Sequence, residues 1–194
     1  MLEKIFKKNK YPCYISKVYF TEKQITREIK KAAKWIDENF KDKNPLAIII
    51  LKGATPFFGQ LYTKVKIDLA CDFVVVSSYK GEITPQSKPD IVLDLHSNVE
   101  GRNLIIIEDI VDTGRTMSLL KDYLLKNKKA NSVTIMTLVD KPEARKMPLK
   151  VDYTCTVISD ESFLIGYGLD FNEHFRNLPY IAEFDKNYIS QFKN

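Results

Sequence analysis

The stretch from Ile105 to Thr116, with the sequence IIIEDIVDTGRT, concentrates residues that could do chemistry. Two adjacent carboxylates, Glu108 and Asp109, follow an apolar run, and Asp112 stands three places after them. Small and hydroxylated residues then open a predicted helix, where free N–H groups and the helix dipole favour a phosphate. Carboxylates beside an anion site make sense if a sugar diol or a hard cation such as Mg²⁺ lies between them. The stretch therefore predicts a phosphate- and magnesium-binding centre.

The same residues have a simpler interpretation. In this interpretation, Asp112 or Thr113 only caps the helix, and Glu108 and Asp109 are solvated, because burial is expected to fall off where the strand ends. Two other kinds of phosphate-binding loop are excluded, because the sequence contains neither a GxxxxGK[ST] loop nor a GxGxxG fingerprint.

Hydrophobic patterning predicts the scaffold that must position this stretch. Continuous apolar runs rich in β-branched residues predict buried strands, and apolar residues at helical spacing predict amphipathic helices. We expect strands at 46–51, 72–76, 104–107, 132–139 and 153–158, and helices at 21–40, 55–66 and 113–127. Strands separated by helices indicate an α/β fold with a parallel sheet. Right-handed crossovers then bring the loops 52–55, 108–116 and 140–142 to the carboxyl edge of the sheet, where ligands bind.

Composition narrows the class of protein. The chain has 194 residues, 44% hydrophobic and 28% charged, which is typical of one globular domain. Its three cysteines have no metal-ligand spacing and it has two histidines, so a zinc site or a catalytic triad has few candidates. No apolar run could cross a bilayer and no signal peptide is evident, so we expect a cytoplasmic protein without a membrane partner.

Charge is distributed unevenly along the chain. Residues 1–43 hold 12 Lys or Arg against 6 Asp or Glu, which could indicate nucleic-acid binding. The lysines alternate with acids at helical spacing, however, so a solvated helix face is the preferred interpretation and no nucleic-acid partner is expected.

Five segments in order resemble a known family. The stretch IIIEDIVDTGRT closely resembles the phosphoribosyl pyrophosphate signature of the type I phosphoribosyltransferases. The others resemble parts of the 6-oxopurine branch, the hypoxanthine-guanine phosphoribosyltransferases: the pyrophosphate loop, the start of the mobile catalytic loop, the purine-reading segment and the hood motif. They are Leu51–Gly53, Ser77–Tyr79, Leu138–Pro142 and Phe163–Arg176. The resemblance implies a parallel-sheet phosphoribosyltransferase fold flanked by helices, with a small hood subdomain.

The resemblance assigns a role to each acid of the central stretch. Glu108 and Asp109 are expected to hold the ribose hydroxyls directly or through Mg²⁺, and Asp170 to organise a second Mg²⁺. Asp112 is expected to face the purine N7 as the general base. The 5′-phosphate is expected to bind four consecutive residues, Thr113, Gly114, Arg115 and Thr116.

The resemblance also implies where the other two parts of the substrates bind. Lys52 and Gly53, helped by Arg176, are expected to bind pyrophosphate, and Ser78 and Tyr79 to begin the mobile loop. On the purine side, Phe163 is expected to stack on the base, Lys141 to donate to its 6-oxo group and the backbone at Leu164 to meet its edge. A lysine donor suits a 6-oxopurine, whereas the amine of adenine would leave it unsatisfied.

The expected function is therefore purine salvage. Hypoxanthine or guanine and 5-phosphoribosyl 1-pyrophosphate would give IMP or GMP and pyrophosphate, with Mg²⁺ as cofactor. The resemblance further implies a single domain over residues 1–194, a hood formed by the N-terminal segment and about 160–194, a mobile loop at about 77–90, and a homodimer or homotetramer. Two alternatives stay open: a xanthine-preferring transferase, and a non-catalytic regulator of the same fold that senses nucleotides or binds RNA.

Overall fold

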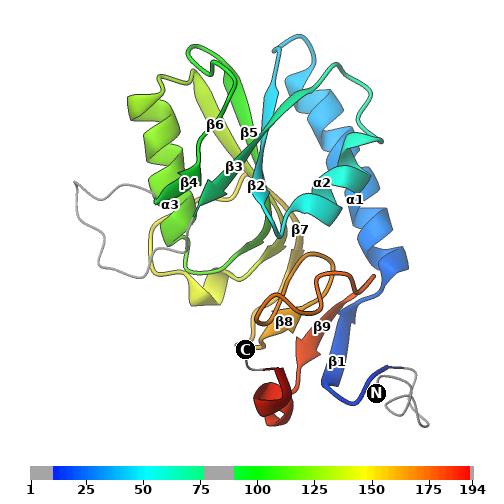
Figure 1. The fold of residues 1–194 in the computed structure, drawn as a ribbon. Coiled ribbons are helices and arrows are strands. Elements are labelled where there is room, and N and C mark those ends of the chain that lie inside the picture. The colour runs from blue at the N-terminus through cyan, green and yellow to red at the C-terminus, as the bar shows by residue number, and fades with distance from the viewer. Residues whose placement is uncertain (1–10, 77–89, 193–194) are drawn as a thin grey trace.

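The protein consists of a large, mostly parallel sheet flanked by helices and a small antiparallel sheet beyond one end of it (Figure 1). The structure is a computed structural model that describes residues 11–76 and 90–192. The large sheet has the strand order β4-β3-β2-β5-β6-β7, in which only the pair β3 and β4 is antiparallel. The small sheet has the order β1-β9-β8. This architecture confirms the expected α/β fold class with a small additional subdomain.

The elements follow the expected alternation of strands and helices. The strands are β1 Ile15–Phe20, β2 Leu46–Leu51, β3 Ala70–Val76, β4 Ile91–Leu93, β5 Asn103–Val111, β6 Ser132–Asp140, β7 Tyr153–Val157, β8 Leu164–Ile165 and β9 Ile181–Phe184. The α-helices are α1 Glu22–Phe40, α2 Thr55–Tyr62 and α3 Arg115–Asp122, and α3 continues into a π-helical turn, Tyr123–Asn127. Short 3₁₀ segments cover Pro142–Ala144 and Lys186–Phe192.

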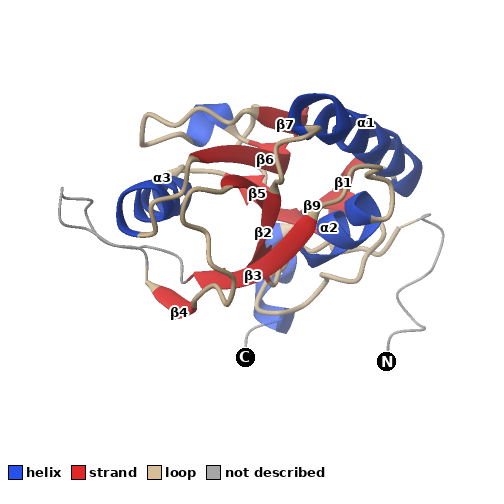
Figure 2. Ribbon diagram, turned by 90° about the horizontal axis from the view of Figure 1, so that it is seen from above, coloured by secondary structure: helices blue, strands red, loops and turns tan. Residues whose placement is uncertain are grey.

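The large sheet carries a separate hydrophobic layer on each face. Helices α1 and α2 cover one face and α3 the other, as the view from above shows (Figure 2). On β2, Ala47 and Ile49 pack with α1 and α2, whereas Leu46, Ile48 and Ile50 pack with α3. Because successive side chains of a strand point to opposite faces, a strand buried on both faces must be continuously apolar. This explains why LAIIIL predicts β2 to the residue.

Helix α1 confirms the expected capping box. The Thr21 side chain accepts from the N–H of Gln24, and the Gln24 side chain accepts from the N–H of Thr21 at 2.9 Å. On its outer side Lys31 pairs with Glu28 at 2.9 Å and Lys34 with Glu38 at 3.4 Å. Lys31 and Lys34 thus lie among acids on a helix face, in agreement with the preferred interpretation.

Several expected boundaries were wrong. Helix α2 starts at Thr55 rather than using it as the cap, and it ends at Tyr62 instead of Lys66. Strand β5 runs on to Val111, four residues beyond its expected end. The strands β1, β4, β8 and β9 were not expected, because their segments are short or lack regular alternation. None of the helices in the described ranges is both long and apolar enough to cross a bilayer.

Candidate active site

The carboxyl edge of the large sheet brings the three expected loops together beside the small sheet. Two adjoining pockets open there, and both are lined by Asp109, Ile110 and Asp112. The first, here called the loop pocket, has a volume of about 460 Å³ and is further lined by the residues after β2 and β5, including Gly53, Glu108, Thr113, Gly114 and Thr116. The second, the aromatic pocket, has a volume of about 240 Å³ and is further lined by Lys141, Ser162, Phe163, Leu164, Leu169 and Asp170.

Asp109 is buried and Glu108 is half-buried, which corrects the expectation that both acids are solvated at this point. Pairing of β2 with β5 ends at Ile107, but β6 continues to pair with β5 as far as Val111. The two acids therefore lie within β5, at the place where β2 turns away. Asp109 is buried and the Oε2 atom of Glu108 is inaccessible to water.

The surroundings of Glu108 and Asp109 raise the pKa of both side chains. Burial, together with the nearby Asp109 carboxylate, raises the pKa of Glu108 well above its ordinary value. Burial also raises the pKa of Asp109, although a hydrogen bond with Glu108 and the charge of Arg176 act in the opposite direction. Among the described residues, Glu108 Oε2 has no hydrogen-bond partner, so the pocket wall holds an unsatisfied acceptor.

The loop after β5 forms an open helix N-terminus. Gly114 is the N-cap of α3 with a φ of 78°, a left-handed conformation that favours glycine, so the N-cap position itself carries no side chain. The Thr113 hydroxyl accepts from the N–H of Arg115, the first residue of the helix, at 3.4 Å. Neither Asp112 nor Thr113 occupies the N-cap position, but the Thr113 side chain does bond to the first N–H of the helix, in part as that alternative expected. A helix start whose N-cap has no side chain, and whose residues line a pocket, suits an anion. Asp112 is exposed at the junction of the two pockets, beside this N-terminus.

The turn after β2 packs its backbone directly against β5. A Cβ atom on Gly53 would lie 1.8 Å from Oδ2 of Asp109, and one on Gly168 would lie 1.9 Å from the carbonyl oxygen of Gly53. The Leu51–Lys52 peptide bond is cis. Thr55 holds the turn from the start of α2, since its hydroxyl donates to the Lys52 carbonyl at 2.7 Å. The glycine at position 53 is thus required by close approach.

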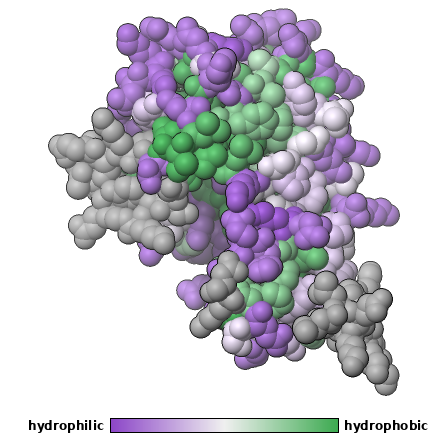
Figure 3. Space-filling view, in the orientation of Figure 1, coloured by the Kyte–Doolittle hydropathy of each residue, from purple (hydrophilic) through white to green (hydrophobic). Residues whose placement is uncertain are grey.

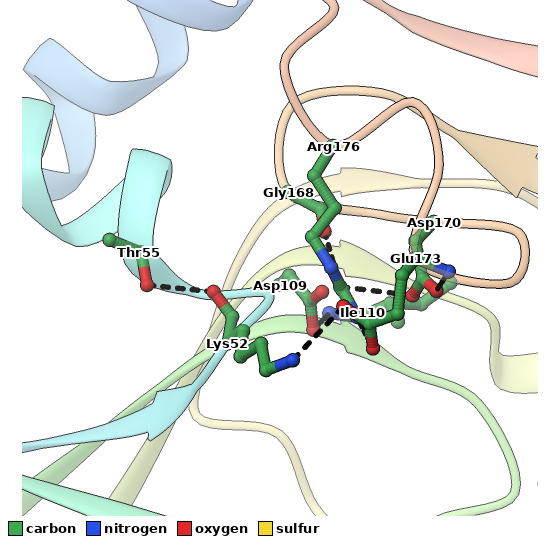
Figure 4. A network of polar contacts seen from close by, with 8 residues as sticks. All are labelled: Lys52, Thr55, Asp109, Ile110, Gly168, Asp170, Glu173 and Arg176. Atoms are coloured by element: carbon green, nitrogen blue, oxygen red, sulfur yellow. Dashed lines mark hydrogen bonds and ion pairs between the residues drawn. The ribbon is translucent and has the colours of Figure 1, made fainter.

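Four charged residues next to the pockets form one network (Figure 4). Lys52 Nζ lies 3.1 Å from Oε2 of Glu173, and Arg176 lies 3.1 Å from Oε1 of the same carboxylate. Arg176 also pairs with Asp170 at 2.9 Å and donates to the Gly168 carbonyl at 2.8 Å. Hydrogen bonds from Arg176, and then from Lys52, lower the pKa of Glu173. Lys52 and Arg176 are therefore close together, as expected. Both pair with the Glu173 carboxylate, and neither is among the described residues that line the two pockets.

The aromatic pocket brings together the three residues expected to meet a purine. Lys141 is buried, and its Nζ donates to the Ser162 carbonyl at 2.8 Å, which leaves other N–H donors of the ammonium group. Phe163 is 43% exposed, and its ring packs edge-on with Phe171 at 5.6 Å between centroids. Leu164 is buried and pairs with β9. An exposed aromatic face beside a buried ammonium group suits a flat, polar ring.

Two groups of residues around the site were missed by sequence reasoning. Arg145 donates to the carbonyl of Asp112 at 2.6 Å and pairs with Asp140. Tyr19 of β1 bonds to Asp160 and, at 2.6 Å, to Ser162, whose carbonyl holds Lys141. No local signal in the sequence distinguishes these residues. Ser78 and Tyr79, expected to begin a mobile loop, lie outside the described residues.

Comparison with known proteins gives a uniform result. The model of the phosphoribosyl transferase domain family matches residues 17–172. The hypoxanthine-guanine phosphoribosyltransferase of Streptococcus pyogenes serotype M3 is 41% identical over 177 residues, covering 91% of this chain and 97% of that protein. Among solved structures, a hypoxanthine phosphoribosyltransferase from Staphylococcus aureus is 34% identical with a TM-score of 0.83, covering 93% of this chain and 96% of that one. A hypoxanthine-guanine phosphoribosyltransferase from Bacillus anthracis is 36% identical with a TM-score of 0.79, covering 88% and 98%.

Proposed function

Because the chain belongs to the hypoxanthine-guanine branch of the phosphoribosyltransferase family, we propose that it makes IMP or GMP. The substrates are hypoxanthine or guanine and 5-phosphoribosyl 1-pyrophosphate, and pyrophosphate is released. One observation carries the proposal: a buried lysine and an exposed phenylalanine line one pocket, the glycine-capped N-terminus of α3 lines the adjoining pocket, and Asp112 lines both. The proposal assigns the aromatic pocket to the base and the loop pocket to the ribose 5-phosphate of the product.

The chemistry of the transfer agrees with this distribution of charge. Breaking the bond to pyrophosphate builds positive charge on the ribose ring and negative charge on the leaving group. Glu108 and Asp109 lie in the wall of the loop pocket, where carboxylate oxygens can accept from ribose hydroxyls. Lys52 and Arg176 supply the positive charge that a departing pyrophosphate requires. Asp112, exposed between the pockets, accepts the proton from N7 as the purine N9 attacks.

Residues Thr113, Gly114, Arg115 and Thr116 are proposed to bind the 5′-phosphate. Phosphate binding by backbone N–H groups is favoured at a helix start whose N-cap has no side chain, and α3 has a glycine there. In the aromatic pocket, Phe163 stacks on the base, Lys141 donates to its 6-oxo group and the Leu164 backbone meets its edge. Ser78 and Tyr79 keep their proposed role in the loop that covers pyrophosphate, and no described residue bears on it.

The residues fit Mg²⁺ as a cofactor. Glu108 has a buried, unsatisfied oxygen in the wall of the loop pocket, Asp109 lines both pockets, and Asp170 lines the aromatic pocket together with Asp109. No three His, Cys, Asp or Glu residues in the described ranges cluster to hold an ion alone. Mg²⁺ prefers such sparse protein ligation, because it keeps waters and binds substrate phosphates. When bound, the ion neutralises charge on pyrophosphate.

A second copy of the chain is the proposed protein partner, as a homodimer or homotetramer. Four large apolar side chains on α2, β3 and β4 are exposed: Tyr62 at 41%, Phe73 at 38%, Val92 at 69% and Leu93 at 50%. Figure 3 shows apolar surface over this side of the molecule. Exposed apolar patches of this kind often mark interfaces. Light scattering coupled to size-exclusion chromatography measures the assembly directly.

Pyrophosphate release tests the proposed function. Purified protein with hypoxanthine, 5-phosphoribosyl 1-pyrophosphate and MgCl₂ is expected to release one pyrophosphate for each IMP formed. Absence of turnover with every 6-oxopurine, together with tight binding of nucleotides, would support a regulator instead. Competition between hypoxanthine, guanine and xanthine then identifies a xanthine-preferring enzyme, whose 2-oxo group presents an acceptor where guanine presents a donor.

A further inference from the structure

The segment that follows β6, residues 141–146, is hydrogen-bonded to residues 111–113 at the end of β5 and in the loop after it. Three hydrogen bonds join them: Lys141 N–H to the Val111 carbonyl at 2.9 Å, Arg145 Nη1 to the Asp112 carbonyl at 2.6 Å, and Lys146 N–H to the Thr113 carbonyl at 2.9 Å. The acceptors are three successive carbonyls of the loop. The outer two bonds are made by backbone, and the central one is made by a side chain.

These bonds set the direction of the N–H groups in the loop. The carbonyl and the N–H on the two sides of a trans peptide bond point in opposite directions. Since the carbonyls of residues 111, 112 and 113 point toward the segment after β6, the N–H groups of 112, 113 and 114 point away from it. The loop residues line the loop pocket, whereas Arg145 is not among the described residues lining either pocket. Arg145 therefore contacts the loop on the side opposite to its N–H groups and away from the loop pocket.

Arg145 is itself held firmly. Its Nη2 pairs with the carboxylate of Asp140, the last residue of β6, and each of the two side chains is only 14% exposed. A shielded ion pair is less screened by solvent than a surface pair. The aliphatic part of Arg145 also covers Gly114, because a Cβ there would lie 2.8 Å from Cδ of Arg145. One side chain thus ties the sheet to both the Asp112 carbonyl and the N-cap of α3.

We propose that Arg145 is a positioning residue for the 5′-phosphate loop, anchored on Asp140. It fixes the carbonyl of Asp112 so that the following N–H group faces the phosphate. It also joins the phosphate loop to the segment carrying Lys141, so that the base and phosphate halves of a nucleotide are held at a fixed spacing. This inference rests on the proposed function, since it requires a nucleotide 5′-phosphate in the loop pocket.

The test compares two ligands that use different parts of the site. IMP needs the 5′-phosphate loop, whereas pyrophosphate binds through Lys52 and Arg176. In the Arg145→Met variant the Kd for IMP, measured by calorimetry, is expected to rise on the order of 10-fold, and that for pyrophosphate to change less than about twofold. Arg145→Lys, which keeps one donor and the charge, is expected to recover part of the IMP affinity.

Each other outcome has a defined meaning. Equal losses for IMP and pyrophosphate would show general damage and overturn the inference, as would unchanged IMP binding in Arg145→Met. If Arg145→Met does not fold, Arg145→Lys and Asp140→Asn decide by the same ratio of the two affinities. A wild-type protein that releases no pyrophosphate and binds no IMP would overturn the proposed function as well. An active wild type with an unaffected variant would overturn the inference alone.

Discussion

Replacing Lys141 with Met removes the donor of the aromatic pocket while nearly keeping the length of the side chain. Lys141 is 7% exposed, and its Nζ lies 2.8 Å from the Ser162 carbonyl. A hydrogen bond from a charged donor contributes about 1.5–3 kcal/mol, and leaving the partner unsatisfied adds to the loss. Loss of the bond to a 6-oxo group therefore corresponds to a roughly 10- to 150-fold decrease in the specificity constant kcat/KM.

The assay is initial-rate kinetics with hypoxanthine, guanine and adenine while the phosphoribosyl donor is saturating. The Michaelis constant for that donor, measured separately with hypoxanthine in excess, is expected to stay within about twofold, because Lys141 does not line the loop pocket. Discrimination against adenine is expected to narrow, because the wild-type penalty for leaving the ammonium group unsatisfied disappears.

Lys150→Met is the matched control for this variant. Lys150 lies in the same connection between β6 and β7, but its side chain is 86% exposed, so its replacement is expected to leave all three rates unchanged. The reasoning would be refuted if folded Lys141→Met retained the wild-type kcat/KM for hypoxanthine and the same preference over adenine.

Three further substitutions test other parts of the site. Asp112→Asn removes the proposed base and is expected to lower kcat about 10²- to 10⁴-fold with a modest change in affinity for the phosphoribosyl donor, measured by rapid-quench kinetics. Gly53→Ala places a Cβ 1.8 Å from Oδ2 of buried Asp109 and is expected to lower the free energy of unfolding by about 1–3 kcal/mol in urea denaturation. Glu173→Gln removes a carboxylate that pairs with Lys52, and is expected to tighten pyrophosphate binding about twofold to fivefold by calorimetry, because the incoming anion no longer competes with an exposed ion pair.

Each of these three predictions has a result that would contradict it. Full activity in Asp112→Asn would remove its role as the base. Gly59→Ala is the control for Gly53→Ala, since a Cβ at Gly59 meets no atom within 4 Å and alanine favours a helix; equal effects of the two changes would contradict the packing argument. Weaker pyrophosphate binding in Glu173→Gln would mean that this carboxylate supports the subsite instead of competing for it.

The fold was predictable where local patterns and burial agree. Strand β2 and helix α1 were predicted closely because a continuously apolar run and a capping box each specify their own limits. Strand β5 was predicted too short. Its continuation to Val111 depends on pairing with β6, and the residues of β5 alone do not indicate this pairing. The short strands β1, β4 and β9 have irregular burial, and β1 and β9 pair with each other although they lie at opposite ends of the chain.

By itself, the sequence determined the fold class and the chemical character of the site, because short ordered motifs carry them. Only the tertiary structure decided how the groups act on one another. It buries Asp109 and the Oε2 atom of Glu108, brings Gly53 close to β5, and places the Arg145 side chain against the Asp112 carbonyl. Lys52 and Glu173, for example, are 121 positions apart in the chain and 3.1 Å apart in space. Such contacts arise from the packing of separate elements, and local sequence patterns carry no record of them.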